Sequence, residues 1–112
     1  TFLCWKYKPN QIVKLLMDFR IKENAFVAWM AARFLGYKSM AIVFGKTIYL
    51  HGASVKTFQS DSKWMKHELK HIEQFKRYGF IQFIFLYLIE SIRHGYLNNR
   101  FEIECREAEN QD

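Results

Sequence analysis

Apolar side chains recur with two different periods along the chain, and the change of period divides it into helical and extended segments. Over five stretches they return every three or four positions, which predicts five helices that each bury one face. The expected helices cover residues 10–19, about 24–35, 62–78, 80–94 and 99–109. Suitable capping residues stand at the predicted ends: Asn10, Asp61 or Ser62, and Asn98 or Asn99 at the starts, and Gly36, Gly79 and Gly95 at the stops.

Between the second and third predicted helices the sequence changes to short runs rich in β-branched and aromatic residues. The runs Met40–Phe44 and Thr47–Leu50 flank Gly45-Lys46, which predicts a β-hairpin. Val55–Phe58, just after it, is expected to be a loop or a short strand. No repeat or linker divides residues 1–112, so we expect one domain. Its predicted class is α+β, mostly helical, with one β-hairpin or small sheet before the third helix.

The composition is typical of a folded domain and narrows the range of partners. Half of the 112 residues are hydrophobic and 18% are aromatic, which argues against disorder. The longest apolar run, residues 83–89, is far shorter than the ~20 residues of a membrane span, so no transmembrane segment is expected. The net charge is +6, but the basic residues are spread along the chain, so nucleic acid is an unfavoured partner. Cys4 and Cys105 can pair or remain thiols, and they leave the compartment open, with the cytoplasm slightly favoured over an exported form.

The third predicted helix contains an H-E-x-x-H motif, His-Glu-Leu-Lys-His at residues 67–71. Four residues span just over one helical turn, so His67 and His71 project from one face and can bind a single Zn²⁺. Glu68 lies on the same side, where it can accept a proton from a water molecule at the metal. The spacing therefore predicts a catalytic zinc site.

The position of the motif on its helix supports this interpretation. At about 100° per residue, Glu68 falls in the middle of the apolar face, with His71 beside it and His67 at its edge. A buried carboxylate destabilises a protein by several kcal/mol unless it is paired or serves a metal site. A His–Glu hydrogen-bonded cluster without a metal is the alternative.

A catalytic zinc site of this kind needs a third protein ligand and one position for water. The metzincin pattern is excluded, because it requires Gly and His where this chain has Gln74 and Arg77. The ligand must come from further along the chain, where the candidates are Glu90, His94, Glu102, Glu104 and Glu107. Glu102 and Glu104 flank the apolar face of the last helix on opposite sides, and periodicity alone does not choose between them.

Three stretches of the chain carry a family resemblance. They are residues 64–74 (WMKHELKHIEQ), Gly79 and residues 94–106 (HGYLNNRFEIECR), preceded by the hairpin over 41–52. With these residues the chain resembles small bacterial zinc metallopeptidases of the gluzincin type over roughly two thirds of its length. The resemblance implies a minimal zincin-like domain, a Zn²⁺ cofactor and a peptide or protein substrate.

The resemblance also bears on the third ligand. Prenyl-protein-processing zinc endopeptidases and phage anti-repressor peptidases are similar here, with a ligand Glu three residues before an Ala that Asp or Asn follows. On this sequence that Glu is Glu102, with Cys105 in place of the Ala and Arg106 at the acidic or amide position. Despite these two departures, the resemblance favours Glu102 over Glu104.

The motif and the resemblance together predict a zinc-dependent metallopeptidase. His67, His71 and Glu102 would hold the metal, and Glu68 would be the general base. The alternatives are a non-catalytic metal-binding domain, such as a sensor or an inactive relative, and a basic module that binds an anionic polymer or lipid.

Other residues have expected supporting roles. Either strand of the hairpin can bind an extended peptide along its edge, or the hairpin only covers the core. Gln74, one turn after His71, is a candidate hydrogen-bond partner of a ligand. Candidate donors to an oxyanion are Arg93, His94 and Tyr96. The residues expected in the core include Trp64, Phe80, Phe83 and Phe85.

Overall fold

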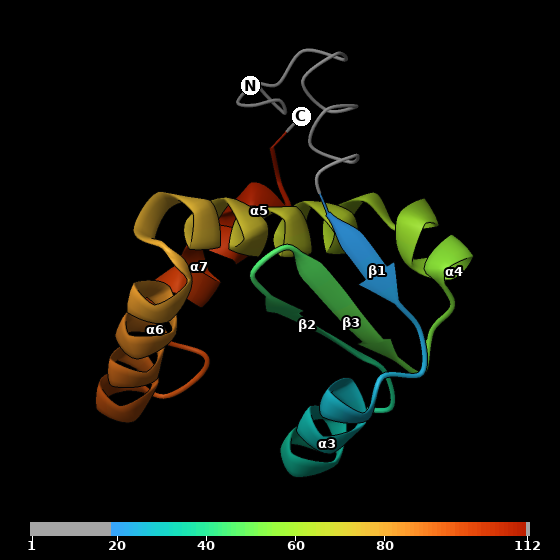
Figure 1. Cartoon of the computed structure of the whole chain (residues 1–112), viewed down its shortest axis with the longest axis horizontal. Helices are drawn as coiled ribbons and strands as arrows, with labels where there is room; N and C mark the ends of the chain where they lie inside the picture. The colour runs from blue at the N-terminus through green and yellow to red at the C-terminus, as the bar shows by residue number, and fades with distance from the viewer. Residues whose placement is uncertain (1–18, 112) are drawn as a thin grey trace.

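The computed structural model describes residues 19–111. The elements in this range are β1 (Arg20–Lys22), α3 (Phe26–Leu35), β2 (Met40–Phe44), β3 (Thr47–His51), α4 (Val55–Ser60), α5 (Ser62–Tyr78), α6 (Phe80–His94) and α7 (Arg100–Ala108) (Figure 1). This mixed α+β arrangement, with a small sheet before the long helices, confirms the predicted fold class. The helix expected over residues 10–19 lies, apart from Phe19, outside the described residues.

The sheet has the order β1-β3-β2, so β3 is its central strand and β2 lies at one edge. Strands β2 and β3 form the predicted antiparallel hairpin, in a register that pairs Phe44 with Thr47. Gly45 begins the two-residue turn with φ +63°, a conformation that residues with a Cβ rarely adopt. Strand β1 runs parallel to β3 on the other side.

Two local predictions differ from the structure. Val55–Phe58, expected to be a loop or short strand, lies in helix α4, because the Ser54 hydroxyl caps the helix by accepting the Thr57 N–H at 3.1 Å. Strand β1 was not predicted, because three residues are too few for a periodic signal and the strand depends on pairing with β3.

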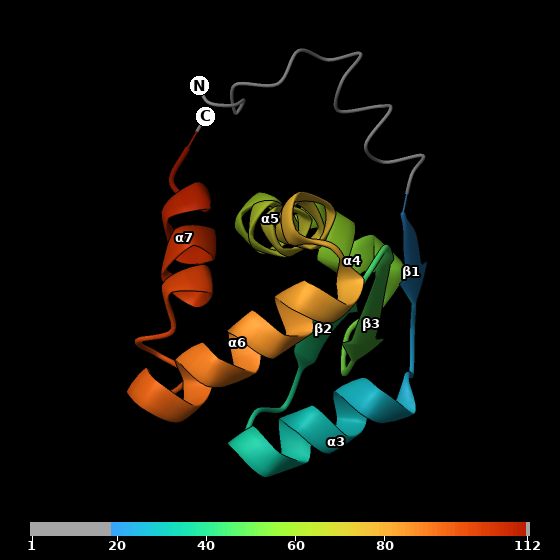
Figure 2. The same cartoon turned by 60° about the vertical axis from the view of Figure 1, so that its left-hand side comes forward.

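Helix α5 is the centre of the packing and separates the sheet from α7, as Figure 2 shows. Its apolar residues meet those of both hairpin strands, of α6 and of α7. The buried apolar cluster consists of Val43, Ile48, Leu50, Phe58, Leu69, Ile72, Phe75, Phe83 and Phe101. The polar residues that α5 turns in the same direction are therefore enclosed by this core.

The outer helices are less buried than the sequence predicted. On α6 Phe83 is buried, but Phe80 and Phe85 are exposed, with 63% of Phe85 accessible. The expectation that all three lie in the core is therefore wrong for two of them, because α6 packs against α5 along one stripe only. No helix within residues 19–111 is both long enough and apolar enough to cross a membrane.

Candidate metal centre

The motif residues lie on the inner face of α5. The helix begins at a capped position, where the Asp61 carboxylate accepts the Trp64 N–H at 3.1 Å. From this start, Glu68 and His71 turn inward and are only 5% and 8% exposed, and the side chain of His67 is half-buried at the edge. The two imidazole rings lie one turn apart with their centroids 5.2 Å from each other. The helix thus brings both rings to one place.

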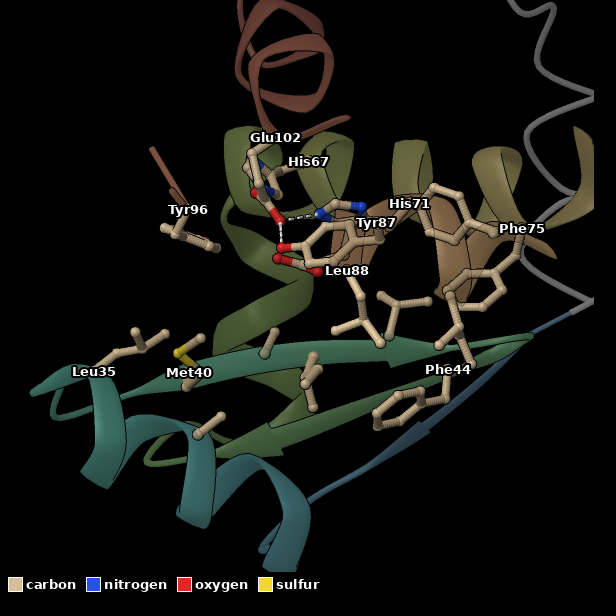
Figure 3. A pocket seen from close by; sticks show the side chains of 17 residues that line it. Leu35, Met40, Phe44, His67, His71, Phe75, Tyr87, Leu88, Tyr96 and Glu102 are labelled. Carbon is tan, nitrogen blue, oxygen red and sulfur yellow. Dashed lines mark hydrogen bonds and ion pairs between the residues drawn. The ribbon is translucent and has the colours of Figure 1, made fainter. Parts of the chain in front are cut away.

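Helix α7 supplies a carboxylate between these rings. Glu102 is almost fully buried, with Oε1 3.1 Å from Nε2 of His67 and Oε2 3.1 Å from Nε2 of His71 (Figure 3). Asn99 fixes the start of α7, because its side chain accepts the Phe101 N–H and donates to the Tyr87 carbonyl and to Ser91 Oγ. The register of α7 against α6 therefore places Glu102 at the rings.

The other nitrogen of each ring faces an acceptor. His71 Nδ1 lies 3.0 Å from Oε1 of Gln74. The orientation of that amide is fixed, because Gln74 Nε2 donates to the Phe101 carbonyl and to Glu104. His67 Nδ1 lies 2.7 Å from a carboxylate oxygen of Glu109. Both rings therefore carry hydrogen on Nδ1, and a neutral ring presents a lone pair at Nε2.

The centre of the cluster is consequently made of acceptors. Two Nε2 atoms face two oxygens of Glu102 at 3.1 Å, and lone pairs repel at that distance unless positive charge lies between them. Protons on the rings or a cation can supply this charge. Two imidazoles and one carboxylate form the donor set of a catalytic zinc site, and partners that fix the outer ring nitrogens are typical of bound metal, so the residues fit Zn²⁺.

Ionisation of the cluster reflects the same demand for positive charge. Burial lowers the pKa of His67, but the hydrogen bond to Glu102 and the nearby carboxylates outweigh it and raise the pKa to about 9. Burial raises the pKa of Glu102, but its hydrogen bonds to both rings dominate and hold the pKa well below the usual range. Burial raises the pKa of Glu68 to about 7, against the opposing effect of the two imidazoles. Without a metal, protons therefore provide the charge.

The remaining third-ligand candidates lie away from the rings. Glu90 accepts the Arg100 backbone N–H, and Glu104 binds Gln74 and Arg77. Glu107 and His94 are exposed. Of the five candidates, the structure brings Glu102 alone into contact with His67 and His71.

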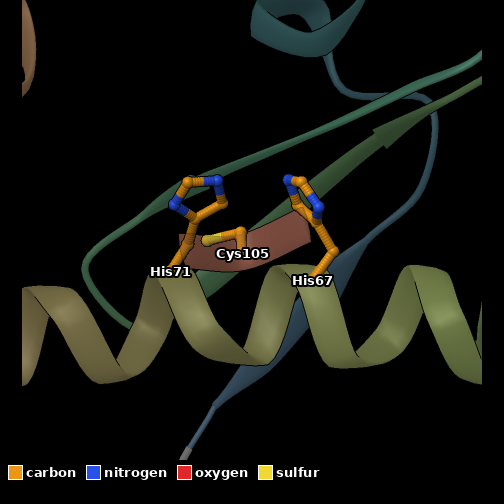
Figure 4. A group of neighbouring side chains, drawn as sticks. All are labelled: His67, His71 and Cys105. Carbon is orange, nitrogen blue, oxygen red and sulfur yellow. The ribbon is translucent and has the colours of Figure 1, made fainter. Parts of the chain in front are cut away.

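Cys105 is a further donor close to the two histidines. Single donor atoms of His67, His71 and Cys105 lie within 4.8 Å of one another (Figure 4). However, the Cys105 Sγ lies 3.8 Å from the Gln74 oxygen that accepts from His71 Nδ1, whereas the Glu102 oxygens lie 3.1 Å from Nε2 of both rings. Burial also raises the pKa of its thiol well above the usual value, so without a metal the thiol stays protonated. Cys105 is free, and Cys4, the other cysteine of the chain, lies outside the described residues.

Two residues of the cluster were not predicted from the sequence. Glu109 follows Glu102 by seven residues, two helical turns on one face, and that spacing was a usable signal. The Tyr87 hydroxyl donates to Glu102 Oε2 at 2.5 Å. A buried tyrosine hydroxyl usually has a hydrogen-bond partner, but the sequence of an apolar helix does not show which residue that partner is.

A cavity of about 310 Å³ opens beside the cluster. Glu68, His67, His71 and Glu102 form its polar end (Figure 3). Its other walls are mostly apolar and come from four elements: Ala31 and Leu35 of α3, Met40 to Phe44 of β2, Phe75 of α5, and Phe83, Ile84 and Leu88 of α6. Tyr96 enters it beside Glu102, whereas Arg93 and His94 are exposed and are not among its walls.

Comparisons with protein-family models, curated proteins and solved structures gave no match to this chain. The resemblance to gluzincin peptidases therefore rests on the residues named above. Function has to be argued from the chemistry of the site.

Proposed function

We propose that this protein is a zinc-dependent metallopeptidase. His67, His71 and Glu102 would hold the metal, and Glu68 would be the general base. The observation that carries the proposal is the convergence of two Nε2 lone pairs on a buried carboxylate, with both outer ring nitrogens already engaged. Only positive charge satisfies this arrangement, and these three donors are typical of a hydrolytic zinc site.

The chemistry divides between the metal and the chain. Zinc bound to these donors supplies a Lewis acid that activates water and polarises a carbonyl. Glu68 lies at the polar end of the cavity beside the three donors, where a carboxylate can take a proton from water and return it. In peptide hydrolysis Glu68 would take the proton of the attacking water and pass it to the leaving amine.

Two tyrosines support this chemistry from different positions. Tyr87 donates to Glu102 and acts as a positioning residue, because its hydrogen bond orients that carboxylate between the rings. Tyr96 lies in the cavity, and burial raises its pKa, so its hydroxyl stays protonated. It is the candidate donor to the oxyanion that develops on the substrate carbonyl.

The edge strand β2 suits an extended peptide. It lines the cavity and, among residues 19–111, pairs with β3 alone. The hairpin closes at the Phe44–Thr47 pair, so the backbone groups of Ala41 and Val43 point away from β3. A substrate strand added there would pass the polar end of the cavity. Of the two hairpin strands, β2 is therefore the candidate substrate edge.

Metal analysis combined with peptide hydrolysis tests the proposal. Purified protein should contain zinc near one atom per chain, and His71→Ala should lose it, whereas His94→Ala, which alters an exposed histidine, should keep it. Glu68→Gln should retain zinc but lower hydrolysis of a peptide library by about 10²–10⁴-fold. Absence of zinc from the unaltered protein would overturn the metal site. Zinc without hydrolysis would identify a non-catalytic metal-binding domain.

A further inference from the structure

Helix α6 turns an apolar stripe to solvent. Ile81, Phe85, Leu88 and Ile92 follow one another at intervals of four, three and four residues, which places them on one side of the helix. All four are exposed, and Ile92 is 84% accessible. This stripe is distinct from the one through Phe83 that packs in the core.

Helix α3 has a matching stripe. Phe26, Met30 and Phe34 recur every four residues, with Trp29 adjoining them, and Phe34 is 90% accessible. The Phe26 and Trp29 rings stack on each other with centroids 5.6 Å apart. The buried residues of α3 are only Ala28 and Ala32, so its large side chains point outward rather than into the core.

The two stripes belong to one region of the molecule. Helices α3 and α6 both line the apolar part of the cavity, through Leu35 and Leu88 among others. In Figures 1 and 2 both helices extend below α5. We call the eight residues of the two stripes the apolar face: Phe26, Trp29, Met30, Phe34, Ile81, Phe85, Leu88 and Ile92.

The charges around the apolar face are mostly basic, with Glu23 as an acidic exception beside Phe26. Helix α3 contains Arg33 and no acidic residue, and Lys38 follows it. Helix α6 ends with Arg93 and His94, both exposed. Its one acidic residue, Glu90, is half-buried and accepts from Arg100. The Arg33 guanidinium lies 5.7 Å above the Trp29 ring, which places a cation within the face itself.

We propose that the apolar face docks on the surface of a bilayer that contains anionic lipid. Aromatic and aliphatic side chains would enter the boundary between headgroups and acyl chains, and the basic residues would meet the headgroups. The net charge of +6 favours the same surface. Exposed apolar patches also bind proteins, but the absence of acidic residues from α3 and from the exposed stripe of α6 favours an anionic surface. The inference is independent of the proposed hydrolysis and of zinc.

Sedimentation with lipid vesicles tests the inference on the full chain. We expect binding to phosphatidylcholine vesicles that contain phosphatidylglycerol, and binding at least about tenfold weaker to phosphatidylcholine alone. Ile92→Ser should reduce partitioning by at least about tenfold, since it replaces an inserted aliphatic side chain with a polar one. Ile103→Ser is the matched control, because it makes the same change at a partly exposed site on α7. It should leave binding unchanged.

Additional variants and conditions distinguish lipid binding from metal-dependent binding and from self-association. Arg33→Gln with Lys38→Gln should weaken the preference for phosphatidylglycerol, and a chelator should have no effect on binding. Thermal unfolding of each variant shows that it is folded. Equal sedimentation of Ile92→Ser and the unaltered chain would overturn the inference. A dimer that Ile92→Ser dissociates, together with no vesicle binding, would also overturn it, because a second copy would then cover the face.

Discussion

The inner face of α5 and the apolar face of α3 and α6 both depart from the usual distribution of polarity, in opposite directions. On α5 ionisable side chains are buried, whereas on the outer helices large apolar side chains are exposed. Neither departure is costless. Burying a carboxylate destabilises a fold by several kcal/mol unless it is paired, and exposing apolar surface forgoes about 25 cal/mol per Å².

The two regions differ in what the chain itself supplies. At the α5 cluster the chain supplies partners for every outer ring nitrogen and leaves only a central positive charge to be added. At the apolar face it supplies a mostly basic rim and no cover within residues 19–111. Under our two proposals, the partners of the two regions differ in size: a single ion for the α5 cluster, and an extended surface for the apolar face.

The largest effect we predict distinguishes Glu102, the proposed third zinc ligand, from Glu104, the other candidate ligand on α7. Glu102→Gln should weaken zinc binding by more than the roughly 10–100-fold that loss of a ligand's hydrogen-bond partner causes, because a charged donor disappears. Glu104→Gln should weaken it by no more than about tenfold, since Glu104 only orients Gln74. Competition with a zinc chelator of known affinity measures both. A larger effect at Glu104 would exchange the two roles.

The second prediction compares a buried and an exposed aromatic residue of one helix. Phe83→Ala should lower the free energy of unfolding by about 3–5 kcal/mol, because Phe83 contacts Phe75 and Phe101 in the core. Phe85→Ala, on the apolar face, should change it by less than about 0.5 kcal/mol. Urea unfolding of both variants provides the measurement. Similar losses would mean that the apolar face is covered within the chain.

The same pair of residues shows where sequence information ends. Phe83 and Phe85 are identical in type, and the periodicity of α6 predicts a helix over 80–94, as observed, without showing which apolar stripe meets a neighbour. That choice depends on how α6 crosses α5, which is a tertiary property. Helix α5 was predictable in both respects, because its caps and its charged outer face define bounds and orientation together.

The position of Glu102 was only partly predictable from the sequence. The sequence placed Glu102 at the border of the apolar face of the last helix. Glu104 lies at the opposite border of the same face, so periodicity did not distinguish the two residues. The tie is broken in space by Asn99, which fixes α7 against α6 through two donated hydrogen bonds. Strand β1 and helix α4 were not predicted for a different reason: each is short, so its local sequence signal is weak.

A third, smaller effect concerns the support of the α5 cluster. Glu109→Ala should weaken zinc binding by about 10–100-fold, because Glu109 holds the His67 ring through Nδ1. Glu107→Ala makes the same change at an exposed position of α7 and should have no effect. Zinc affinities of the two variants and of the unaltered protein decide the matter. Equal affinities would mean that the His67 ring needs no such support.

The smallest expected effect tests how the cluster uses its thiol. Cys105→Ala should keep zinc at one atom per chain and alter the affinity by no more than a few fold, because the Glu102 oxygens lie 3.1 Å from Nε2 of both rings while Sγ contacts Gln74. A cobalt-substituted protein gives an independent reading, since a thiolate ligand adds an intense charge-transfer absorption that two imidazoles and a carboxylate do not. Loss of metal on removing this thiol would make Cys105 the third donor in place of Glu102. The α5 cluster would then hold its metal through two imidazoles and a thiolate, and Glu102 would be a hydrogen-bond partner of the rings rather than a ligand.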